Sequence, residues 1–469
     1  MTGRMFHRIF AFVLLLSACG AAAAATQVNT DSLRLTFDAS GNMQSALACF
    51  PACTGENARV QQFGDASVIR FEGAGAGAWS QTESHTQTHY ELTFRQGAGA
   101  RLTWRIPVNG YRIELQHAGI AGITLQSGES FRPREAAGFG NWLEQSRYVI
   151  LNSGDAVQVA LQDTDVTSQQ ADQWLGFRNR YWTLMAAPPS SLSVKPETAD
   201  EMIDARISVN LIEGEWSFYI GPIEPSLLAR ASPELSNLLY AGLWFWLRWI
   251  CFALFHLLAI IHLAIPSWGL SIMVLSVAVN ILMTPLSRIA DRFQDQVNDT
   301  EARLAPELQR IKQNFKGEEQ AAKILALYKT ERVHPLYSLK SLMGVAVVIP
   351  VFIGAFDMLA ENIHLLHTGF LWISDLSRPD DLFNLPFMLP FFGNEFNALP
   401  FLMTGLSVVA SSLHNPPALT AGLRKKQVRN MLLLAAAFFV LFYTFPAGMV
   451  LYWTTNNLIS VSKSLWSRR

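Results

Sequence analysis

Small polar side chains that recur inside apolar segments are the residues of this chain best suited to chemistry. They are Ser276, Asn280, Thr284, Thr404, Ser407, Ser411, Asn456 and Asn457. The first three, and likewise the next three, have helical spacing, so each set falls on one face of a helix. A polar group in an apolar environment costs free energy unless it meets a partner or water. Two interpretations stay open: helix packing through interhelical hydrogen bonds, or a wet groove that receives a polar ligand.

Enzyme chemistry is not indicated by the rest of the sequence. The N-terminal half shows no nucleophile–base pattern, metal-ligand cluster or glycine-rich phosphate loop. His85 and His89 share a helical spacing, but they lie in a segment with strand periodicity, so we expect them at the surface. We therefore expect no catalytic residue, no bound metal and no cofactor.

The polar side chains lie in the second of two regions that differ in how polar and apolar residues are distributed. With 469 residues, of which 50% are hydrophobic and 16% charged, the chain is too long for one ordinary domain and too apolar for a typical soluble protein. Polar and apolar positions mix finely as far as about residue 230, whereas beyond it apolar residues gather into runs near bilayer length. The sequence therefore predicts two regions, residues 26–230 and residues 231–469.

The first 25 residues have the layout of an export signal. Basic residues precede an apolar run at residues 9–16, and small residues follow as far as Ala25. We predict that residues 1–25 are a signal peptide or membrane anchor, and that the following region is exported. Cys19 fits a lipoprotein cleavage box and is a candidate for lipidation, while cleavage after the alanines and an uncleaved anchor are the alternatives.

Cys49 and Cys53 lie close together in the region expected to be exported. Three residues separate them, and an oxidising compartment favours a small structural disulfide between such neighbours. Copper or redox chemistry is the weaker interpretation, because no pattern of His or Met surrounds the pair. The pair is therefore predicted to be structural.

Residues 26–230 are predicted to fold as an all-β sandwich. Leu102, Trp104 and Ile106 alternate with more polar neighbours, the period-two pattern of a strand with one buried face. Asn109-Gly110 follows them, and this pair is a strong hairpin signal because both positions tolerate positive φ. Similar strands before and after indicate a β meander, for which a binding or spacer role is expected.

Residues 231–469 are predicted to form an all-α polytopic membrane core of five helices. The expected spans are residues 268–286, 342–359, 399–413, 431–445 and 449–465. Residues 238–263 are also apolar, but they include Arg248 and several tryptophans. That composition favours a helix lying in the membrane interface over one that crosses the bilayer.

Basic residues indicate the orientation of this core. Lys and Arg concentrate in residues 287–340 and before the fourth span, and Lys463 lies in the tail, whereas residues 361–400 are poor in them. Loops rich in Lys and Arg stay in the cytoplasm. Residues 287–340 are thus predicted to be a cytoplasmic helical hairpin that turns at Lys316-Gly317. The hairpin is either a solvated structural element or a docking surface.

Several short stretches resemble the YidC insertase family, in the family's order along nearly the whole chain. They include Val28-Asn29-Thr30-Asp31-Ser32-Leu33-Arg34-Leu35, Phe218-Tyr219-Ile220-Gly221-Pro222, Trp268-Gly269-Leu270-Ser271-Ile272, Val333-His334-Pro335-Leu336, Leu371-Trp372-Ile373-Ser374-Asp375-Leu376 and Phe445-Pro446-Ala447-Gly448-Met449. Each stretch alone is weakly specific. The ordered set is specific, so the chain is identified as a divergent member of that family.

The resemblance implies a membrane protein insertase and chaperone of the bacterial inner membrane, multi-pass, with its β domain in the periplasm. It implies a hydrophilic groove open to the cytoplasm and the lipid, lined here by the polar residues named above, and no nucleotide hydrolysis. The implied partners are nascent membrane proteins and membrane lipid. Ribosomes, targeting factors and the Sec translocon are further candidates, and no nucleic-acid specificity is expected.

Two departures from the family pattern bear on this function. Asn280 stands where the family usually has a groove arginine, and Val348 stands where it has a glutamine. An amide can donate and accept hydrogen bonds but carries no charge, so the sequence predicts a groove without a fixed positive charge. The alternative function is therefore a non-inserting scaffold or assembly factor for a specific membrane complex.

Overall fold

The computed structural model describes most of the chain and divides it into two compact units. The described residues are 25–55, 57–64, 67–73, 77–97, 99–131, 136–152, 155–160, 169–194, 206–210, 213–331, 333–334, 339–413 and 421–466. Unit 1 comprises Met1–Phe131, Leu161–Gly176 and Leu184–Gly221, and unit 2 comprises Arg132–Ala160, Phe177–Thr183 and Pro222–Arg469. The predicted signal segment, including Cys19, lies outside the described residues.

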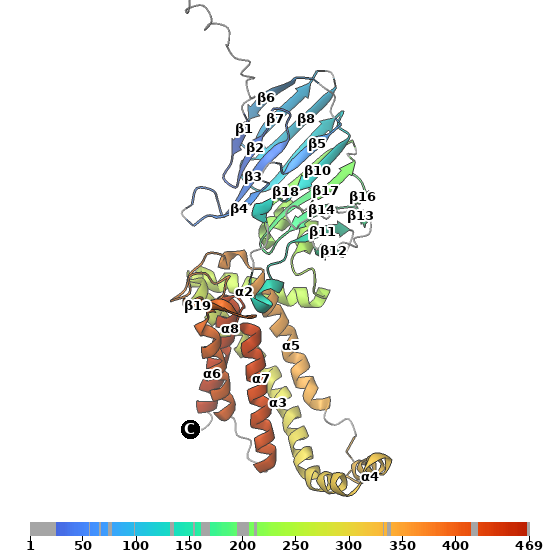
Figure 1. Cartoon of the computed structure of the whole chain (residues 1–469), viewed down its shortest axis with the longest axis vertical. Helices are drawn as coiled ribbons and strands as arrows, with labels where there is room; N and C mark the ends of the chain where they lie inside the picture. The colour runs from blue at the N-terminus through green and yellow to red at the C-terminus, as the bar shows by residue number, and fades with distance from the viewer. Residues whose placement is uncertain are drawn as a thin grey trace, which may run out of the picture. The chain divides into compact units, whose positions relative to one another are not determined.

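Unit 1 contains a seven-stranded sheet in the order β1-β2-β3-β5-β10-β17, with β4 paired to β3 (Figure 1). Its strands are β1 (Thr26–Asn29), β2 (Leu33–Phe37), β3 (Met43–Phe50), β4 (Arg59–Phe63), β5 (Ile69–Glu72), β10 (Gly122–Gln126) and β17 (Arg206–Asn210). Alternate residues of β2 are buried, namely Leu33, Leu35 and Phe37. This burial follows from the period-two alternation in the sequence.

A second sheet carries the predicted meander. Its strands include β6 (Trp79–His85), β7 (His89–Gln96), β8 (Ala100–Pro107), β9 (Arg112–Ala118), β14 (Trp174–Arg178), β15 (Trp182–Ala187) and β18 (Glu215–Pro222), in the order β14-β15-β18-β9-β8-β7-β6. The end of β14 and the start of β15 belong to unit 2. Gly110, between β8 and β9, has φ +115°, a conformation that glycine adopts without a steric penalty. The short strands β13 (Gln169–Ala171) and β16 (Leu192–Val194) pair separately.

The two sheets of unit 1 pack through aromatic side chains. Trp104 on β8 is fully buried, and its ring centroid lies 5.4 Å from that of Phe37 and 5.8 Å from that of Phe71, both on the other sheet. Its indole Nε1 donates a hydrogen bond of 3.0 Å to the carbonyl of Gly41. A buried tryptophan with its donor satisfied stabilises such a core. Unit 1 is therefore a sandwich of two sheets.

Unit 2 is mainly helical. Its α-helices are α1 (Pro225–Ala231), α2 (Phe245–Ala264), α3 (Trp268–Asn314), α4 (Gly317–Thr330), α5 (Leu339–Ala360), α6 (Ala398–Leu413), α7 (Ala421–Phe442) and α8 (Ala447–Trp466). It also contains the hairpins β11 (Arg147–Asn152) with β12 (Asp155–Ala160) and β19 (Phe383–Leu389) with β20 (Gly393–Phe396), and short 3₁₀ turns such as η2 (Gly138–Trp142) and η3 (Pro233–Leu238). The chain is thus β-rich first and helical afterwards, as its sequence predicts.

Helix α3 is longer than the sequence suggested. It continues for 47 residues through Pro285 and Pro306, whereas we expected the first span to end near residue 286. A proline removes only one helical hydrogen bond, so a long helix can pass through it with a local kink. The predicted turn does occur at Lys316-Gly317, where Gly317 has φ +65° and α4 begins. Helix α8 likewise begins after the predicted break at Phe445-Pro446.

Two helices of the described residues are long and apolar enough to cross a membrane, by length and composition. They are Phe245–Ala264 in α2 and Trp268–Ile289 in α3. Shorter apolar helices lie at Ile349–Ala360, Ala398–Leu413 and Val428–Phe442. The count of five spans and the interfacial position of α2 stay predictions.

The division into units does not follow a single break near residue 230. Two segments that precede this position in the sequence, Arg132–Ala160 and Phe177–Thr183, group with the helices. Long-range polar contacts hold the second of these segments to the helical part of unit 2. Arg178 pairs with Glu361 at 3.0 Å, and the Nε of Arg180 donates to the carbonyl of Ala360 at 2.7 Å.

Candidate functional site

Asn280 is the centre of a polar cluster between α3 and α8. Its amide nitrogen donates a short hydrogen bond to the side-chain oxygen of Asn456 on α8, and another of 3.0 Å to the carbonyl of Ser276. Its amide oxygen lies 3.4 Å from the ammonium nitrogen of Lys463, also on α8. We call Asn280, Asn456 and Lys463 the amide–lysine cluster. It joins two apolar helices that are far apart in the sequence.

Exposure increases along both helices of this cluster. On α3, Ser276 is fully buried, while Asn280 and Thr284 are half-buried. On α8, Asn456 is half-buried and Lys463 is exposed. The cluster therefore lies where buried side chains give way to exposed ones.

Two hydroxyl groups near the helix contacts are buried without partners. The side-chain oxygens of Ser276 on α3 and Thr404 on α6 make no hydrogen bond within the described part of the chain. The hydroxyl of Thr284, by contrast, donates to the carbonyl of Asn280 at 2.8 Å, within its own helix. A buried polar group with no partner costs free energy, so such groups are rare in folded proteins. The hydroxyls of Ser276 and Thr404 therefore have hydrogen-bonding capacity that the described residues leave unused.

The polar residues predicted from the sequence fall into two sets. Asn456 faces α3, whereas the amide nitrogen of its neighbour Asn457 donates to the carbonyl of Met403 on α6 at 2.9 Å. Successive residues of a helix point about 100° apart, so the two asparagines reach different neighbours. Ser407 is half-buried and Ser411 is exposed on α6. The described contacts join Ser276, Asn280 and Asn456, but they do not join the α6 serines to this set.

The positive charge of the amide–lysine cluster corrects one expectation. Because Asn280 stands where the family usually has an arginine, the sequence predicted a site without a fixed positive charge. Lys463 was used only as evidence that the C-terminal tail is cytoplasmic. The structure places the Lys463 ammonium beside Asn280, so the site has a cation supplied by α8. Lys463 lies seven residues after Asn456, which is two helical turns and hence the same face. This spacing is the feature of the sequence that could have placed Lys463 near Asn456. Lysine side chains on a helix also point toward the helix N-terminus.

Three further expectations concern the cysteine pair, Val348 and a bound metal. A disulfide joins Cys49 and Cys53 in unit 1. Val348 lies on α5 at a position whose side chain is outside the described residues. The described residues contain no group of three or more His, Cys, Asp or Glu side chains that could hold a metal ion.

A buried arginine pair in unit 2 was not indicated by any sequence motif. The guanidinium of Arg180 donates to Glu144 at 2.6 Å and to the carbonyls of Ala360 and Ser377 at 2.7 and 3.0 Å. Arg178 donates to Glu361 and to the carbonyl of Leu238. Bonds from a buried guanidinium to carboxylates are strong and directional. The pair fixes residues 177–183 to the loop that follows α5.

Loss of Arg180 is expected to destabilise unit 2. In Arg180→Gln the carboxylate of Glu144, whose side chain is 22% exposed, loses a partner that is itself 5% exposed. Removing one member of such a pair costs about 3 to 5 kcal/mol. Thermal unfolding of the full-length protein in detergent measures this loss. The matched control is Arg105→Gln, which breaks the exposed Arg105–Glu114 pair of unit 1, where about 1 kcal/mol or less is expected; equal shifts would contradict the prediction.

The start of α6 is fixed by one acidic side chain. A carboxylate oxygen of Asp380 accepts hydrogen bonds from the backbone nitrogens of Ala398 and Leu399 at 2.8 and 3.0 Å. Burial raises the pKa of Asp380, although these bonds and one from the Trp372 indole favour its charged form. A carboxylate at a helix N-terminus stabilises that helix. Asp380 therefore positions α6 against α8.

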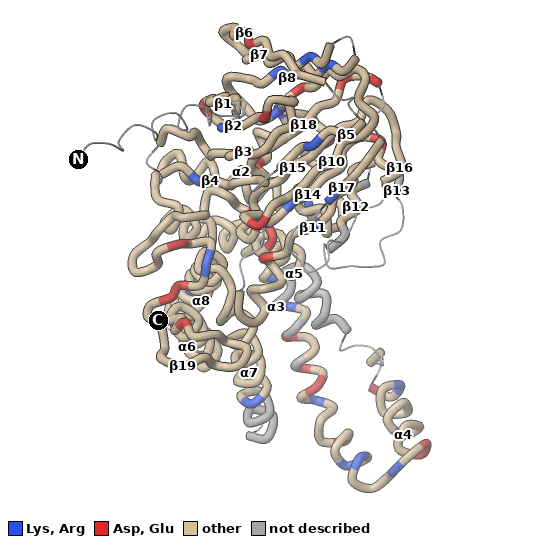
Figure 2. Tube along the Cα trace, turned by 45° about the horizontal axis from the view of Figure 1, so that its top comes forward, with Lys and Arg blue, Asp and Glu red and all other residues tan. Residues whose placement is uncertain are grey.

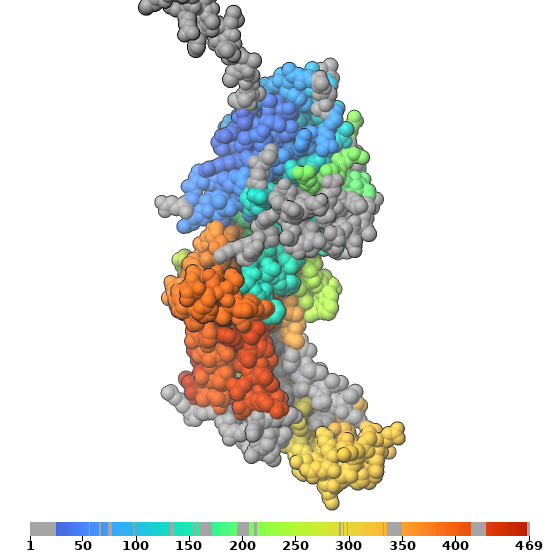
Figure 3. Space-filling view, viewed as in Figure 1, coloured from blue at the N-terminus to red at the C-terminus, as the bar shows by residue number. Residues whose placement is uncertain are grey.

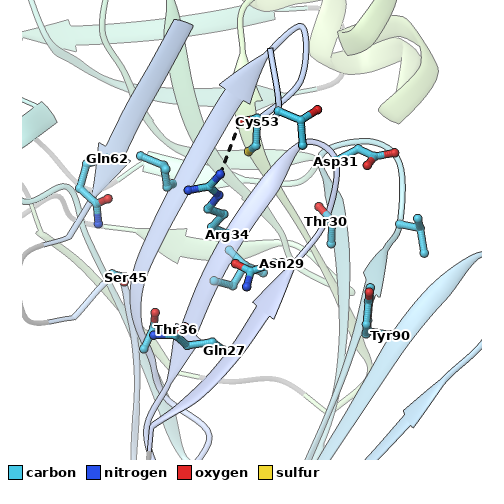
Figure 4. A pocket seen from close by; sticks show the side chains of 14 residues that line it. Gln27, Asn29, Thr30, Asp31, Arg34, Thr36, Ser45, Cys53, Gln62 and Tyr90 are labelled. Carbon is cyan, nitrogen blue, oxygen red and sulfur yellow. Dashed lines mark hydrogen bonds between the residues drawn. The ribbon is translucent and has the colours of Figure 1, made fainter. Parts of the chain in front are cut away.

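Unit 1 contains a polar hollow of about 670 Å³ on the strands β1 to β4 and nearby loops (Figure 4). Gln27, Asn29, Arg34 and Gln62 project around it, and the Arg34 guanidinium donates to the carbonyl of Cys53 at 3.4 Å. Its side chains are those of a solvated sheet face. The hollow offers hydrogen bonds, but its lining lacks a nucleophile–base pair.

The helical part of the chain is similar to proteins of known family. Residues 260–469 match the family model described as "60Kd inner membrane protein". The chain is 34% identical over 250 residues to the "Membrane protein insertase YidC" of Cellvibrio japonicus, covering 53% of this chain and 40% of the relative. It is 31% identical over 249 residues to that of Janthinobacterium sp., covering 53% and 41%.

A third relative matches a longer part of the chain. The insertase of Methylobacillus flagellatus is 28% identical over 343 residues, covering 70% of this chain and 56% of the relative. The matches thus span about half of these relatives' length. A solved structure titled "Active YidC insertase crystal structure with the first transmembrane domain resolved" covers 94% of this chain and 92% of its own, with 16% identity and a TM-score of 0.38.

The matched residues include α3 to α8 and every polar residue of the candidate site. The relatives' names agree with the family that the ordered sequence motifs resemble. Through its helical residues 260–469 the chain is similar to the 60Kd inner membrane proteins and to the YidC insertases named above.

Proposed function

We propose that this protein is a membrane protein insertase and chaperone of the bacterial inner membrane, and that it acts without enzymatic chemistry. The observation that carries the proposal is the amide–lysine cluster between α3 and α8. Two apolar helices bring together amides and a cation where burial gives way to exposure. A pure packing contact between apolar helices would not require a cation there.

The cluster would lower the barrier for a polar segment that enters the bilayer. An unpaired polar group in hydrocarbon costs several kcal/mol. Asn280 and Asn456 can replace part of the water around an incoming backbone, and the hydroxyls of Ser276 and Thr404 extend the row of hydrogen-bonding groups inward. The client's apolar helix then moves sideways into lipid, driven by its own hydrophobicity. In this mechanism α3, α6 and α8 border a hydrophilic groove open to the cytoplasm.

The proposed orientation follows the charges of unit 2. Figure 2 shows Lys, Arg, Asp and Glu along the second half of α3 and on α4, whereas the first half of α3 is nearly free of them. Basic loops remain in the cytoplasm, so α3, α5, α6, α7 and α8 would cross the membrane and unit 1 would be periplasmic. Helix α2 would lie in the interface, where its exposed Trp244 and Trp249 suit the headgroup region.

The hairpin of α3 and α4 is the proposed contact for cytoplasmic partners. In Figure 3 the yellow atoms around α4 gather at one end of unit 2. Helix α4 has no buried residue, and Leu325 is 56% exposed. An exposed helix with apolar and basic residues can bind another protein or a charged surface. Nascent membrane proteins and lipid are the primary proposed partners, with ribosomes, targeting factors and the Sec translocon as candidates for this hairpin.

The deciding experiment combines complementation with reconstitution. Expression of the full chain should rescue cells depleted of their own insertase, and purified protein in vesicles should insert a single-span client. A photoreactive residue at position 280 should crosslink to that client during insertion. Failure of both rescue and insertion, with one membrane protein co-purifying stably, would reject insertion in favour of a scaffold.

A further inference from the structure

Unit 2 contains a cavity of about 490 Å³ that the insertase mechanism does not use. Apolar side chains of α5, of the end of α7 and of the turn after α7 form much of its wall, namely Phe352, Ile353, Phe356, Leu441 and Phe445. Arg147, Arg178, Arg180, Asp357 and Glu361 supply its charges. Ligand sites are typically concave, mostly apolar and about 300–1,000 Å³ in volume, with a few polar groups that fix orientation. The cavity meets these criteria.

Arg147 is a cation in this cavity that lacks an anionic partner. Its guanidinium donates to the amide oxygens of Gln158 and Gln145, each at 3.2 Å. No carboxylate of the described residues forms an ion pair with it. Burial and the charge of Arg178 both lower the pKa of Arg147, while Glu361 opposes them. An anion bound beside Arg147 would relieve the repulsion between the two arginines.

Two further groups lining the cavity are unsatisfied. The Nη2 of Arg180, whose side chain is 5% exposed, makes no hydrogen bond within the described part of the chain. Asp357, half-buried on the last turn of α5, has no cationic partner there either. Glu361 differs, since it already accepts from Arg178 and from the backbone nitrogen of Tyr240. Two guanidinium groups and one carboxylate in the cavity therefore have hydrogen-bonding or ion-pairing capacity that the described residues leave unused.

We propose that the cavity binds a phospholipid whose headgroup carries both a phosphate and a primary ammonium. Arg147 and Arg180 would hold the phosphate, Asp357 would accept hydrogen bonds from the ammonium, and the first part of an acyl chain would lie against Phe352, Phe356 and Leu441. Arginine suits phosphate because its planar donors match the oxygens. The proposal rests on the proposed membrane location of α5 and α7, but not on insertion itself.

Lipid binding to the full-length protein tests the assignment. Native mass spectrometry in detergent would measure binding of phosphatidylethanolamine, phosphatidylglycerol and phosphatidylcholine, with inorganic phosphate as a competitor. We expect phosphatidylethanolamine to bind most tightly and phosphate alone to displace it poorly. Arg147→Gln should weaken its binding about tenfold, and Asp357→Asn should remove the preference for the ammonium headgroup.

A second variant keeps the test sound if Arg147→Gln affects folding. Gly242 lines the cavity, and a Cβ placed on it meets no atom within 4 Å. Gly242→Trp should therefore block lipid entry without removing a charge, while Arg105→Gln on unit 1 should leave lipid binding unchanged. Equal binding of all three lipids, or undiminished binding in both Arg147→Gln and Gly242→Trp, would overturn the proposal. If an acidic peptide binds in the cavity and the three lipids do not, the cavity is assigned to a protein segment instead.

Lipid binding and insertion are separable outcomes. If Gly242→Trp loses lipid but the protein still inserts clients, the insertase proposal stands without this site. If the protein binds phosphatidylethanolamine as described but fails to insert clients, the cavity assignment stands and the proposed function falls.

Discussion

Replacing Asn280 with leucine is expected to reduce client insertion about tenfold or more. The substitution removes the amide that joins α3 to α8, and it leaves the Asn456 side chain and the Lys463 ammonium without that partner. An unsatisfied polar group costs about 1 to 3 kcal/mol, and each 1.4 kcal/mol on a barrier is tenfold in rate. Initial insertion rates into proteoliposomes, measured at equal protein content, give the effect directly.

The control for this change is a substitution at an exposed neighbouring position of the same helix, which points about 100° away from Asn280. Ile281 is 66% exposed next to Asn280, so Ile281→Leu should insert clients at the normal rate. Asn280→Gln keeps the amide and should retain part of the activity. Insertion that survives Asn280→Leu unchanged would show that the cluster serves only to pack α3 against α8.

Replacing Lys463 with methionine should slow insertion selectively for clients with acidic flanks. Methionine keeps an unbranched chain but removes the one charge of the amide–lysine cluster. A cation near the membrane surface attracts an acidic segment, and this attraction is weakened by salt. We expect about a tenfold loss for a client whose flank is acidic and little change for one whose flank is neutral. Insertion assays with this client pair at low and high salt measure the difference.

Moving the charge to the neighbouring helix provides the matched rescue. In Asn280→Arg combined with Lys463→Met, the cation would come from α3 in place of α8, and insertion of the acidic client should recover. Lys463→Arg should also retain activity. If both clients lose insertion equally in Lys463→Met, or if Asn280→Arg restores nothing, the lysine acts through helix packing and not through its charge.

Local patterns determined much of the fold. The alternation of Leu102, Trp104 and Ile106 placed them inside a strand, because side chains of a strand point to opposite faces in turn. Asn109-Gly110 and Lys316-Gly317 marked turns because glycine adopts positive φ readily. The Phe445-Pro446 break between two helices was equally local. These features depend on a few adjacent residues, so the sequence is enough to predict them.

Only the tertiary structure decided which distant residues meet. Lys463 and Asn280 are 183 positions apart, and Arg180 and Ala360 are 180 apart. No local pattern encodes such contacts, because they depend on which helix faces pack and on how far long side chains reach. The sequence alone therefore predicted polar stripes, a signal segment and an insertase-like arrangement of helices. The packing of α3 against α8 supplied the positive charge, and the buried arginines joined residues 177–183 to the helical unit.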